Sequence, residues 1–243
     1  MTAREPYIVP RCAVDPTVLY SDDDMLMVDK PAGLLSVPGR HPLNRDCLLA
    51  RLAGQWPDAL IVHRLDLDTS GLMVLARNKP SHEALSRQFR ERRVVKEYEA
   101  WVWGLVEHDQ GEIDLPLIAD WPNRPLQKVC HSEGKPALTR YWVLHRDPAR
   151  NRSHLLLEPH TGRSHQLRLH LQALGHPILG DRFYGHAEAV AGASRLLLHA
   201  TRLTLGHPRD GRVMHWQSRA SFGAVSGGQA ALDHPTRDCT LGG

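Results

Sequence analysis

Short apolar runs of strand length recur along the chain, and they restrict its fold more than any other feature. The clearest are MLMV at 25–28, GLMVLA at 71–76 and KEYEAWVW at 96–103. Further candidate strands cover 137–144, 153–158, 196–205 and 213–217. Runs of this kind, bounded by glycine, proline and small polar residues, are typical of β-strands. The sequence therefore predicts a protein built mainly from strands.

Helical periodicity is confined to two segments. In SHEALSRQFRERR, Ser81 is the expected N-cap, and Leu85 and Phe89 are spaced to lie on one face. In residues 163–174 leucines recur at helical spacing, and Gly175 is expected to end the helix. A regular alternation of strands and helices is absent, which disfavours a doubly wound parallel sheet. We expect an α+β fold with a mixed, mainly antiparallel central sheet and a few flanking helices.

The length of 243 residues suffices for one large domain. We expect an irregular lead-in over residues 1–15, one domain that carries the function over 16–220, and a disordered tail over 221–243. No apolar run approaches the roughly 20 residues of a membrane span, and the 4 cysteines form no C-x-x-C pair. These features predict a cytoplasmic protein with reduced thiols and no membrane partner.

The polar stretch HRLDLDTSGL at 63–72 is the first candidate site. The spacing of Asp66 and Asp68 is that of aspartyl phosphatases of the haloacid dehalogenase type, whose first carboxylate is a nucleophile. However, His63 and Arg64 stand where such enzymes have a buried apolar strand. A solvated turn is the simplest alternative for an isolated D-x-D, so other parts of the chain must decide between these interpretations.

Motifs of the common nucleotide and zinc sites are missing. The patterns G-x-x-x-x-G-K-[ST], G-x-G-x-x-G and H-E-x-x-H do not occur. The 16 histidines are scattered, and the spacing of His165 and His170 does not place them on one helical face as a ligand pair. We therefore expect neither a metal nor a cofactor.

Two basic segments favour an anionic partner, although the formal net charge is only +3. In segment 161–185, Arg163, His165 and Arg168 surround a short amphipathic helix, with His165 and Arg168 on its polar side. An arginine there is able to reach a carboxylate and hold it ionised. The second segment is a cluster of basic residues that precedes Tyr98: Arg77, Lys79, Arg87, Arg90, Arg92, Arg93 and Lys96. A solvated helix is the simpler alternative, but this density beside an aromatic residue favours contact with a phosphate backbone.

At these residues the chain resembles the RluA-type pseudouridine synthases. HRLDLDTSGL is similar to their H-R-L-D-x-x-[TS]-S-G-L motif, and KPAGLLSVPG, KEYEAWVWG, TGRSHQLRLHLQALGHPILGDRFYG and LLLHA are similar to their other motifs in the same order. The resemblance covers approximately residues 18–218. LPLIADWPNRPLQKVC further resembles the small subgroup without an N-terminal S4 domain, and we expect none here.

The resemblance implies a role for particular residues. Asp66 matches the catalytic carboxylate, and Arg168 matches the arginine that pairs with it and keeps it charged. Tyr98 matches the aromatic residue that lies against the target base, where a proton is transferred at C5. Arg64 matches the residue that enters the RNA stack when the uridine leaves it. The remaining RNA-binding residues expected from the resemblance and the basic clusters are Arg163, Lys96, Arg90, Arg93 and His165.

These features together predict an RNA pseudouridine synthase, with residues 16–220 as a single catalytic domain. The subgroup resemblance implies 23S ribosomal RNA, a tRNA anticodon stem-loop, or both as substrates, and no DNA. We expect a monomer, because no coiled-coil pattern or long apolar stripe indicates assembly. A non-catalytic RNA-binding or ribosome-assembly module is the main alternative, and an aspartyl phosphatase is the third. The chemical role of Asp66 stays open between addition to the base, attack at C1′ and removal of the 2′ proton.

Overall fold

The computed structural model describes residues 7–222. The strands are β1 (Thr17–Ser21), β2 (Met25–Lys30), β3 (Leu60–Ile61), β4 (Ser70–Ala76), β5 (Val95–Trp103), β6 (Gln110–Asp114), β7 (Leu117–Ala119), β8 (Gln127–Val129), β9 (Leu138–Asp147), β10 (Arg152–Pro159), β11 (Leu198–Gly206) and β12 (Val213–Gln217). The α-helices are α1 (Leu48–Leu52), α2 (Lys79–Arg90), α3 (Gln166–Ala173) and α4 (Ala187–Ala191), and η1 (Trp121–Asn123) and η2 (Pro148–Arg150) are 3₁₀ turns. No helix within 7–222 is long and apolar enough to cross a membrane.

The predicted terminal segments are only partly within this range. Residues 7–15 of the expected lead-in form neither helix nor strand. Of the expected tail, residues 223–243 lie outside the described residues, so their predicted disorder stays a prediction.

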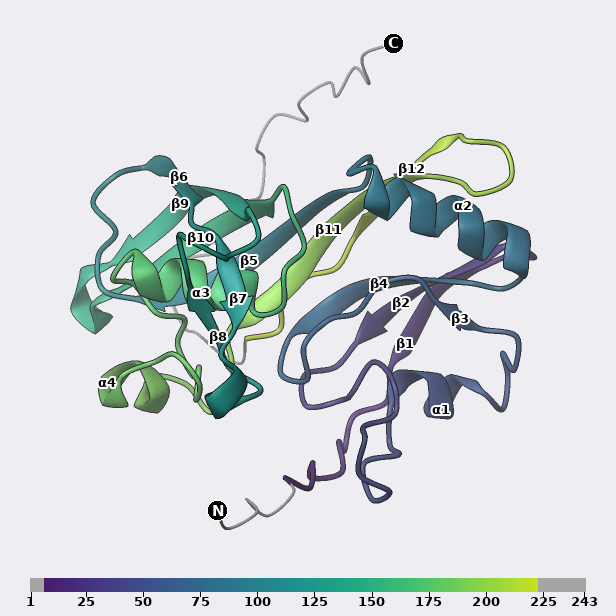
Figure 1. The fold of residues 1–243 in the computed structure, drawn as a ribbon, viewed down its shortest axis with the longest axis horizontal. Coiled ribbons are helices and arrows are strands. Elements are labelled where there is room, and N and C mark those ends of the chain that lie inside the picture. The colour runs from purple at the N-terminus through teal and green to yellow at the C-terminus, as the bar shows by residue number, and fades with distance from the viewer. Residues whose placement is uncertain (1–6, 223–243) are drawn as a thin grey trace.

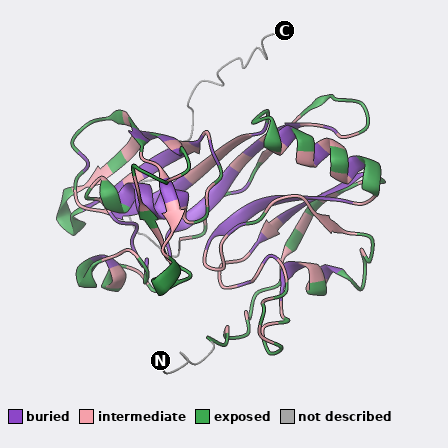
Figure 2. Ribbon diagram, viewed as in Figure 1, coloured by how far each residue is buried: buried purple, intermediate pink, exposed green. Residues whose placement is uncertain are grey.

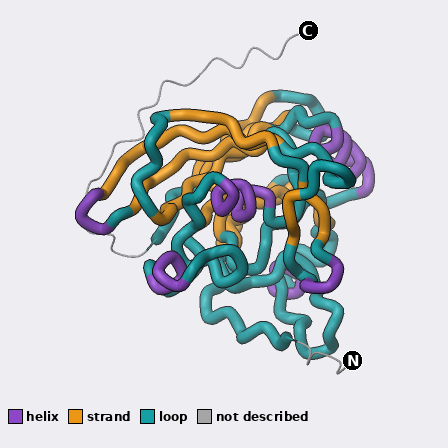
Figure 3. Tube along the Cα trace, turned by 60° about the vertical axis from the view of Figure 1, so that its left-hand side comes forward, coloured by secondary structure: helices purple, strands orange, loops and turns teal. Residues whose placement is uncertain are grey.

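One large sheet organises the described residues. Its strand order is β1-β2-β4-β11-β5-β10-β9-β6, with β3 added to β4 and β12 added to β11, and β7 and β8 form a separate hairpin. Of the pairings between these strands, β4–β11 is parallel and the others are antiparallel. The predicted α+β fold with a mixed, mainly antiparallel sheet is confirmed. Figures 1 and 3 show this sheet as a curved layer in which β5 and β11 run between the two ends of the molecule.

The parallel junction of β4 and β11 brings two distant motifs together. Ser70 pairs with His199, and Gly71 pairs with Ala200. Gly71 has a φ of +113°, and a Cβ atom at this position would overlap the backbone of Ala200. Beyond this junction the same edge of β11 pairs with β12 instead. The HRLDLDTSGL segment therefore enters the sheet at a branch point, where only glycine permits the close approach.

Apolar side chains cover both faces of the sheet. On one face, α2 contributes Leu85 to a cluster with residues of β2, β4 and β11. On the other face, α1 contributes Leu48 and Leu52, and α3 contributes Leu167 and Leu171 to a second cluster over β5 and β10. Figure 2 shows α3 buried along most of its length, whereas α2 has an exposed outer side. The segments that carry the motifs are thus fixed to a well-packed core.

Two details of the predicted helices were wrong. The N-cap of α2 is Asn78, whose side chain accepts a hydrogen bond from the Ser81 amide, so Ser81 lies inside the first turn. The second helix begins at Gln166 rather than Arg163, because His165 adopts a left-handed conformation with φ of 54°. The Gln166 side chain accepts hydrogen bonds from the Thr161 hydroxyl and the Arg163 amide, which shapes the loop before the helix. Gly175 has a φ of +88° just after the helix, consistent with the expected stop.

Candidate active site

A cleft of about 1270 Å³ opens on the face of the sheet that carries α3. Its walls come from residues 35–37, the HRLDLDT loop, the end of α2 with the start of β5, and residues 158–168. The predicted site residues that line it are Arg64, Asp66, Arg90, Lys96, Tyr98, Arg163, His165 and Arg168. Arg93 is the exception: it lines a separate, smaller hollow and forms an ion pair of 2.7 Å with Glu91.

A buried lysine stabilises the loop that carries Asp66. Lys30 is 0% exposed, and its Nζ donates hydrogen bonds to the carbonyls of Pro31, Leu34 and Leu67 at 2.9, 2.8 and 3.3 Å. Burial lowers the pKa of Lys30 to about 8, although the negative charges of Asp66 and Asp68 oppose this shift. Lys30 therefore joins the K-P-x-G segment to the residue directly after Asp66. The sequence indicated Lys30 only as part of a motif.

Two further contacts hold the loop on its other side. The Ser36 hydroxyl donates to the Leu65 carbonyl at 2.8 Å. His63 accepts a hydrogen bond of 3.1 Å from the Val74 amide and stacks on Phe89 with ring centroids 4.5 Å apart. Burial lowers the pKa of His63 to about 3, so this ring is neutral and serves as an acceptor. The backbone around Asp66 is thus held from several directions, and this leaves the carboxylate itself to face the cleft.

Within residues 7–222, Arg168 is the cation that forms an ion pair with the Asp66 carboxylate. Their ion pair measures 3.7 Å, and the Asp66 side chain is 28% exposed. The shorter contacts of Arg168 are to Asp181, at 2.8 and 2.6 Å, and both of those side chains are almost fully buried. Burial disfavours the charge on Arg168, but the Asp181 and Asp66 carboxylates outweigh it and raise its pKa above the ordinary value.

The environment of Arg168 differs from the expected polar helix face. Its side chain is 3% exposed, so it lies inside the protein rather than in solvent. Asp181 was not indicated by the sequence as a functional residue. It also accepts hydrogen bonds from the Phe183 and Tyr184 amides at 2.9 and 3.2 Å. Asp181 therefore fixes Arg168, and Arg168 in turn presents a guanidinium to Asp66.

Tyr98 extends from β5 into the same cleft. Burial raises the pKa of its hydroxyl, and the negative charge of Asp66 adds to the shift. The phenol is therefore protonated at neutral pH. Among the described residues its hydroxyl has no hydrogen-bond partner, which leaves it available to a molecule in the cleft.

His165 lines the cleft beside Arg168, and Tyr184 contacts it. The Nδ1 atom of His165 lies 2.8 Å from the Tyr184 hydroxyl, and this hydroxyl accepts a hydrogen bond of 2.9 Å from the Gln127 amide. Burial lowers the pKa of His165, and burial raises the pKa of Tyr184 to about 12. These contacts join α3 to the β7–β8 hairpin. Tyr184 and Asp181 both lie within the motif segment 161–185, but no role was expected for either residue.

The other predicted RNA-binding cations differ in how firmly they are held. Arg64 is exposed and has no hydrogen bond or ion pair within 7–222. Arg163 donates a hydrogen bond of 3.1 Å to the Pro136 carbonyl. Lys96 donates to the Thr161 carbonyl at 3.3 Å, and burial lowers its pKa to about 8, with a contribution from the nearby Arg92 charge. The cleft thus combines the Asp66 and Glu158 carboxylates, the Tyr98 phenol and several cations.

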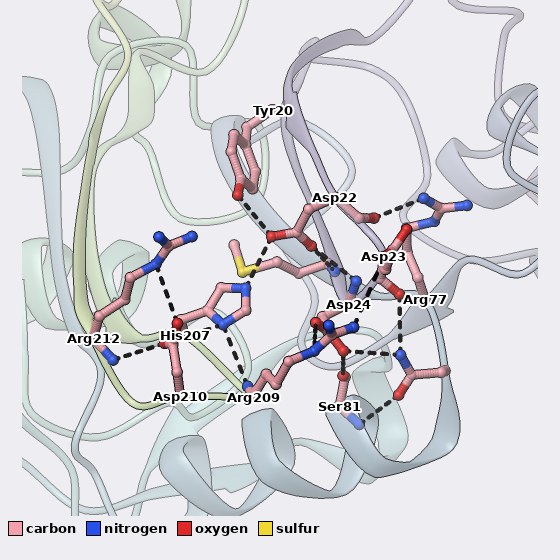
Figure 4. Close-up of polar contacts among 12 residues, drawn as sticks. Tyr20, Asp22, Asp23, Asp24, Arg77, Ser81, His207, Arg209, Asp210 and Arg212 are labelled. Atoms are coloured by element: carbon pink, nitrogen blue, oxygen red, sulfur yellow. Dashed lines mark hydrogen bonds and ion pairs between the residues drawn. The ribbon is translucent and has the colours of Figure 1, made fainter.

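A second polar cluster lies outside the cleft, between the β1–β2 turn, the start of α2 and the β11–β12 loop (Figure 4). Ligand-type atoms of Asp22, Asp24 and His207 lie within 4.8 Å of one another. Each already has protein partners: His207 contacts Asp22 at 2.9 Å, and Arg209 contacts Asp24 at 2.6 Å. Tyr20 donates to Asp22 at 2.6 Å. Cationic and hydroxyl groups therefore satisfy the carboxylates of this cluster, and we interpret it as a polar contact that joins three segments of the chain.

Comparison with known proteins identifies relatives of the whole arrangement. A family model described as RNA pseudouridylate synthase matches residues 24–173. The dual-specificity RNA pseudouridine synthase RluA of Yersinia pestis is 54% identical over 205 residues, which cover 84% of this chain and 99% of that protein. RluA of Escherichia coli (strain K12) is 51% identical over 219 residues, 90% of this chain and 96% of that protein. The solved structure of Human RNA Pseudouridylate Synthase Domain Containing 1 aligns with a TM-score of 0.73 and 30% identity over 88% of this chain and 87% of that one.

Proposed function

Because the chain belongs to the RNA pseudouridylate synthase family, we propose that Asp66, Tyr98 and Arg168 are the residues that perform the reaction. An RNA pseudouridine synthase breaks the bond between N1 of a uridine and C1′ of its ribose, then joins C1′ to C5. The C5 proton is lost, and N1 gains a proton. The site needs an ionised carboxylate beside the sugar and the base, and a proton-transfer group beside the base.

The pairing of Asp66 with Arg168 is the observation that carries the proposal. Arg168 is itself fixed by Asp181 through two hydrogen bonds, so its guanidinium lies in one place, 3.7 Å from Asp66. A fixed cation orients the carboxylate and balances its charge in a partly buried site. Asp66 is therefore ready to act before a substrate arrives. Preorganisation of this kind lowers the cost of reaching a transition state.

Tyr98 and Arg64 act on the base rather than on the sugar. The Tyr98 hydroxyl is protonated, lacks a protein partner within the described residues, and shares the cleft with Asp66. These features support a role for Tyr98 in transfer of the proton at C5. Arg64, next to Leu65 and Asp66, is exposed and unpaired among residues 7–222. Its planar guanidinium replaces part of the stacking that is lost when the uridine leaves the RNA.

The substrates proposed are 23S ribosomal RNA, the anticodon stem-loop of tRNA, or both. The relatives named dual-specificity synthases support the idea of more than one RNA. Arg90, Lys96, Arg163 and His165 line the cleft and are proposed to hold phosphates, which positions the RNA without reading its sequence. Arg93 contributes from outside the cleft. We expect a monomer that works in the cytoplasm, with no cofactor and no action on DNA.

Tritium release from RNA labelled at C5 of uridine tests the proposal. Wild type and Asp66→Asn are incubated with transcripts of tRNA and 23S ribosomal RNA without added metal or nucleotide. Release by the wild type and none by Asp66→Asn, with equal RNA binding, is the expected result. Full activity of Asp66→Asn would overturn the assignment of the carboxylate. Loss of RNA binding together with activity would indicate that Asp66 holds substrate instead.

A further inference from the structure

The β7–β8 hairpin ends in a tryptophan that makes no contribution to the core. Trp121 begins the η1 turn at the hairpin tip and is 63% exposed. Figure 2 shows this turn, below the β8 label of Figure 1, as exposed on its outer side. An indole is costly to leave in water, because it is one of the largest apolar side chains. Its exposure points to a partner outside the chain.

Arg124 covers one face of this indole. The centre of its guanidinium lies 3.6 Å from the centroid of the Trp121 ring. With one face covered and the residue still 63% exposed, the opposite face is open to solvent. An indole face beside a guanidinium is a favourable surface for an unpaired nucleobase, which stacks on the ring while the cation meets a phosphate.

The hairpin tip is rigid enough to present this pair in one orientation. The Asp120 amide donates to the Leu126 carbonyl at 2.9 Å, and the Asn123 amide donates to the Asp120 carbonyl at 2.9 Å. The Asn123 side chain also donates to the Asp120 carboxylate at 2.8 Å. A surface that is already ordered loses less conformational entropy when a ligand binds.

The same hairpin is attached to the active-site cleft. Pro125, next to Arg124, lines the cleft. The Gln127 amide donates to Tyr184, which contacts His165 in the cleft wall. A chain bound at Asp66 is therefore able to continue onto the hairpin tip. The occupant expected there is a nucleotide near the target uridine.

The charges along the hairpin favour an anionic chain. Arg124, Lys128 and Lys135 are exposed, and no ion pair within residues 7–222 includes them. Unpaired cations beside an aromatic surface are typical of sites for single-stranded nucleic acid.

We propose that the β7–β8 hairpin is an RNA-docking arm, in which Trp121 stacks on an unpaired base flanking the target uridine and Arg124 binds the adjoining phosphate. This inference rests on the proposed function, because the occupant is the substrate RNA itself. It assigns a recognition role to a segment remote from the reacting atoms. Binding through Trp121 helps select which loop is presented to Asp66.

Trp121→Ala, Trp121→Phe and Trp142→Ala are compared with wild type. Across β5, β10 and β9, Tyr98 is in register with Leu157 and Tyr141, whereas the neighbouring Glu99 is in register with Leu156 and Trp142. Neighbouring residues of a strand point to opposite faces, so Trp142 faces away from Tyr98 and is a matched control. Dissociation constants for an RNA stem-loop are measured with single-turnover rates at saturating RNA. Trp121→Ala should weaken binding roughly 5- to 150-fold, as for the loss of one stacked base. Trp121→Phe should retain most of the affinity, and Trp142→Ala all of it.

RNAs with one loop nucleotide at a time made abasic then locate the base. At the position that stacks on Trp121, base removal should weaken wild-type binding but have no further effect on Trp121→Ala. The stacking proposal would be overturned if, at every position, the effects of base removal and of Trp121→Ala on the binding free energy were additive. It would also be overturned if Trp121→Ala bound RNA with wild-type affinity. Both results require an active wild type. Absence of tritium release by the wild type would instead contradict the proposed function.

Discussion

Asp181 binds the guanidinium of Arg168 through two hydrogen bonds, of 2.8 and 2.6 Å, and both side chains are almost completely buried. The Asp66 carboxylate, which we propose to be catalytic, is farther from the same arginine, at 3.7 Å. Asp181 is therefore a positioning residue: it acts on Asp66 only through Arg168. Its own charge is also what makes a buried arginine acceptable in the fold.

Substitution of Asp181 by asparagine should reduce both stability and turnover. Removal of one partner from a buried pair costs about 3–5 kcal/mol, because the other charge is left uncompensated. Glu112→Gln, which breaks an exposed pair with Arg140, should cost about 0–1 kcal/mol. Urea unfolding gives the stabilities, and tritium release at a temperature where both variants are folded gives the turnover. Wild-type turnover in folded Asp181→Asn would show that Arg168 does not depend on this contact.

RNA binding should weaken as the pH rises through about 8, because Lys96 then loses its proton. Its pKa in the folded protein is about 8, below the ordinary value of about 10.4. Phosphates favour the protonated form, so the dissociation constant should increase above this pH. Lys96→Arg keeps its charge and should flatten the profile. Fluorescence anisotropy at fixed ionic strength between about pH 7 and 9.5 measures the effect, and identical profiles for both proteins would exclude Lys96 as its source.

Lys30→Met should destabilise the protein by about 2–4 kcal/mol, because one buried and two partly buried carbonyls lose their donor. Since one of these carbonyls belongs to Leu67, turnover should fall as well. Lys96→Met, which removes a donor from the Thr161 carbonyl, is the matched comparison and should cost less. Thermal unfolding of both variants checks this order. Equal losses would mean that the three contacts of Lys30 contribute little.

Arg64→Ala should impair extrusion of the target uridine while the fold stays intact. Loss of a stacked guanidinium corresponds to roughly 1–3 kcal/mol. A fluorescent base analogue next to the target reports unstacking directly. Arg64→Lys keeps the charge but not the plane, so it should recover binding more than extrusion. Equal recovery of both would reduce the role of Arg64 to phosphate contact.

Much of the sheet could be predicted because its central strands are apolar on both faces. The central strands at 25–28 and 71–76 were placed within two residues at each end, and so was the strand at 213–217, whose residues alternate between exposed and half-buried. The short β3, β7 and β8 have too few residues to show a period, and they form only where a neighbouring strand pairs with them. Ser81 was mistaken for the cap because Asn78 is equally suited, and Pro80 in the first turn was the available signal for Asn78.

The candidate site was predictable where the resemblance implies a role for a residue, and less so where a residue lies in a motif without such a role. Asp66, Tyr98 and Arg168 all reach the cleft. Asp181 shares the motif segment 161–185 with Arg168, but a separation of 13 residues through a loop does not indicate a contact, so only the folded chain shows it. Arg93 was predicted to bind RNA but does not line the cleft, because a dense run of basic residues does not indicate which of its side chains face the cleft.

Gly71 makes the branch point of the sheet intolerant of variation. A side chain at this position would overlap the backbone of Ala200, and the positive φ adds strain. Gly33 also has a positive φ, but no atom lies within 4 Å of a Cβ built there. A saturation library selected for activity should therefore recover only glycine at position 71, whereas position 33 should also accept asparagine. Sequence variation in this enzyme is thus limited by the contact between two backbone segments, as well as by the chemistry of its reaction.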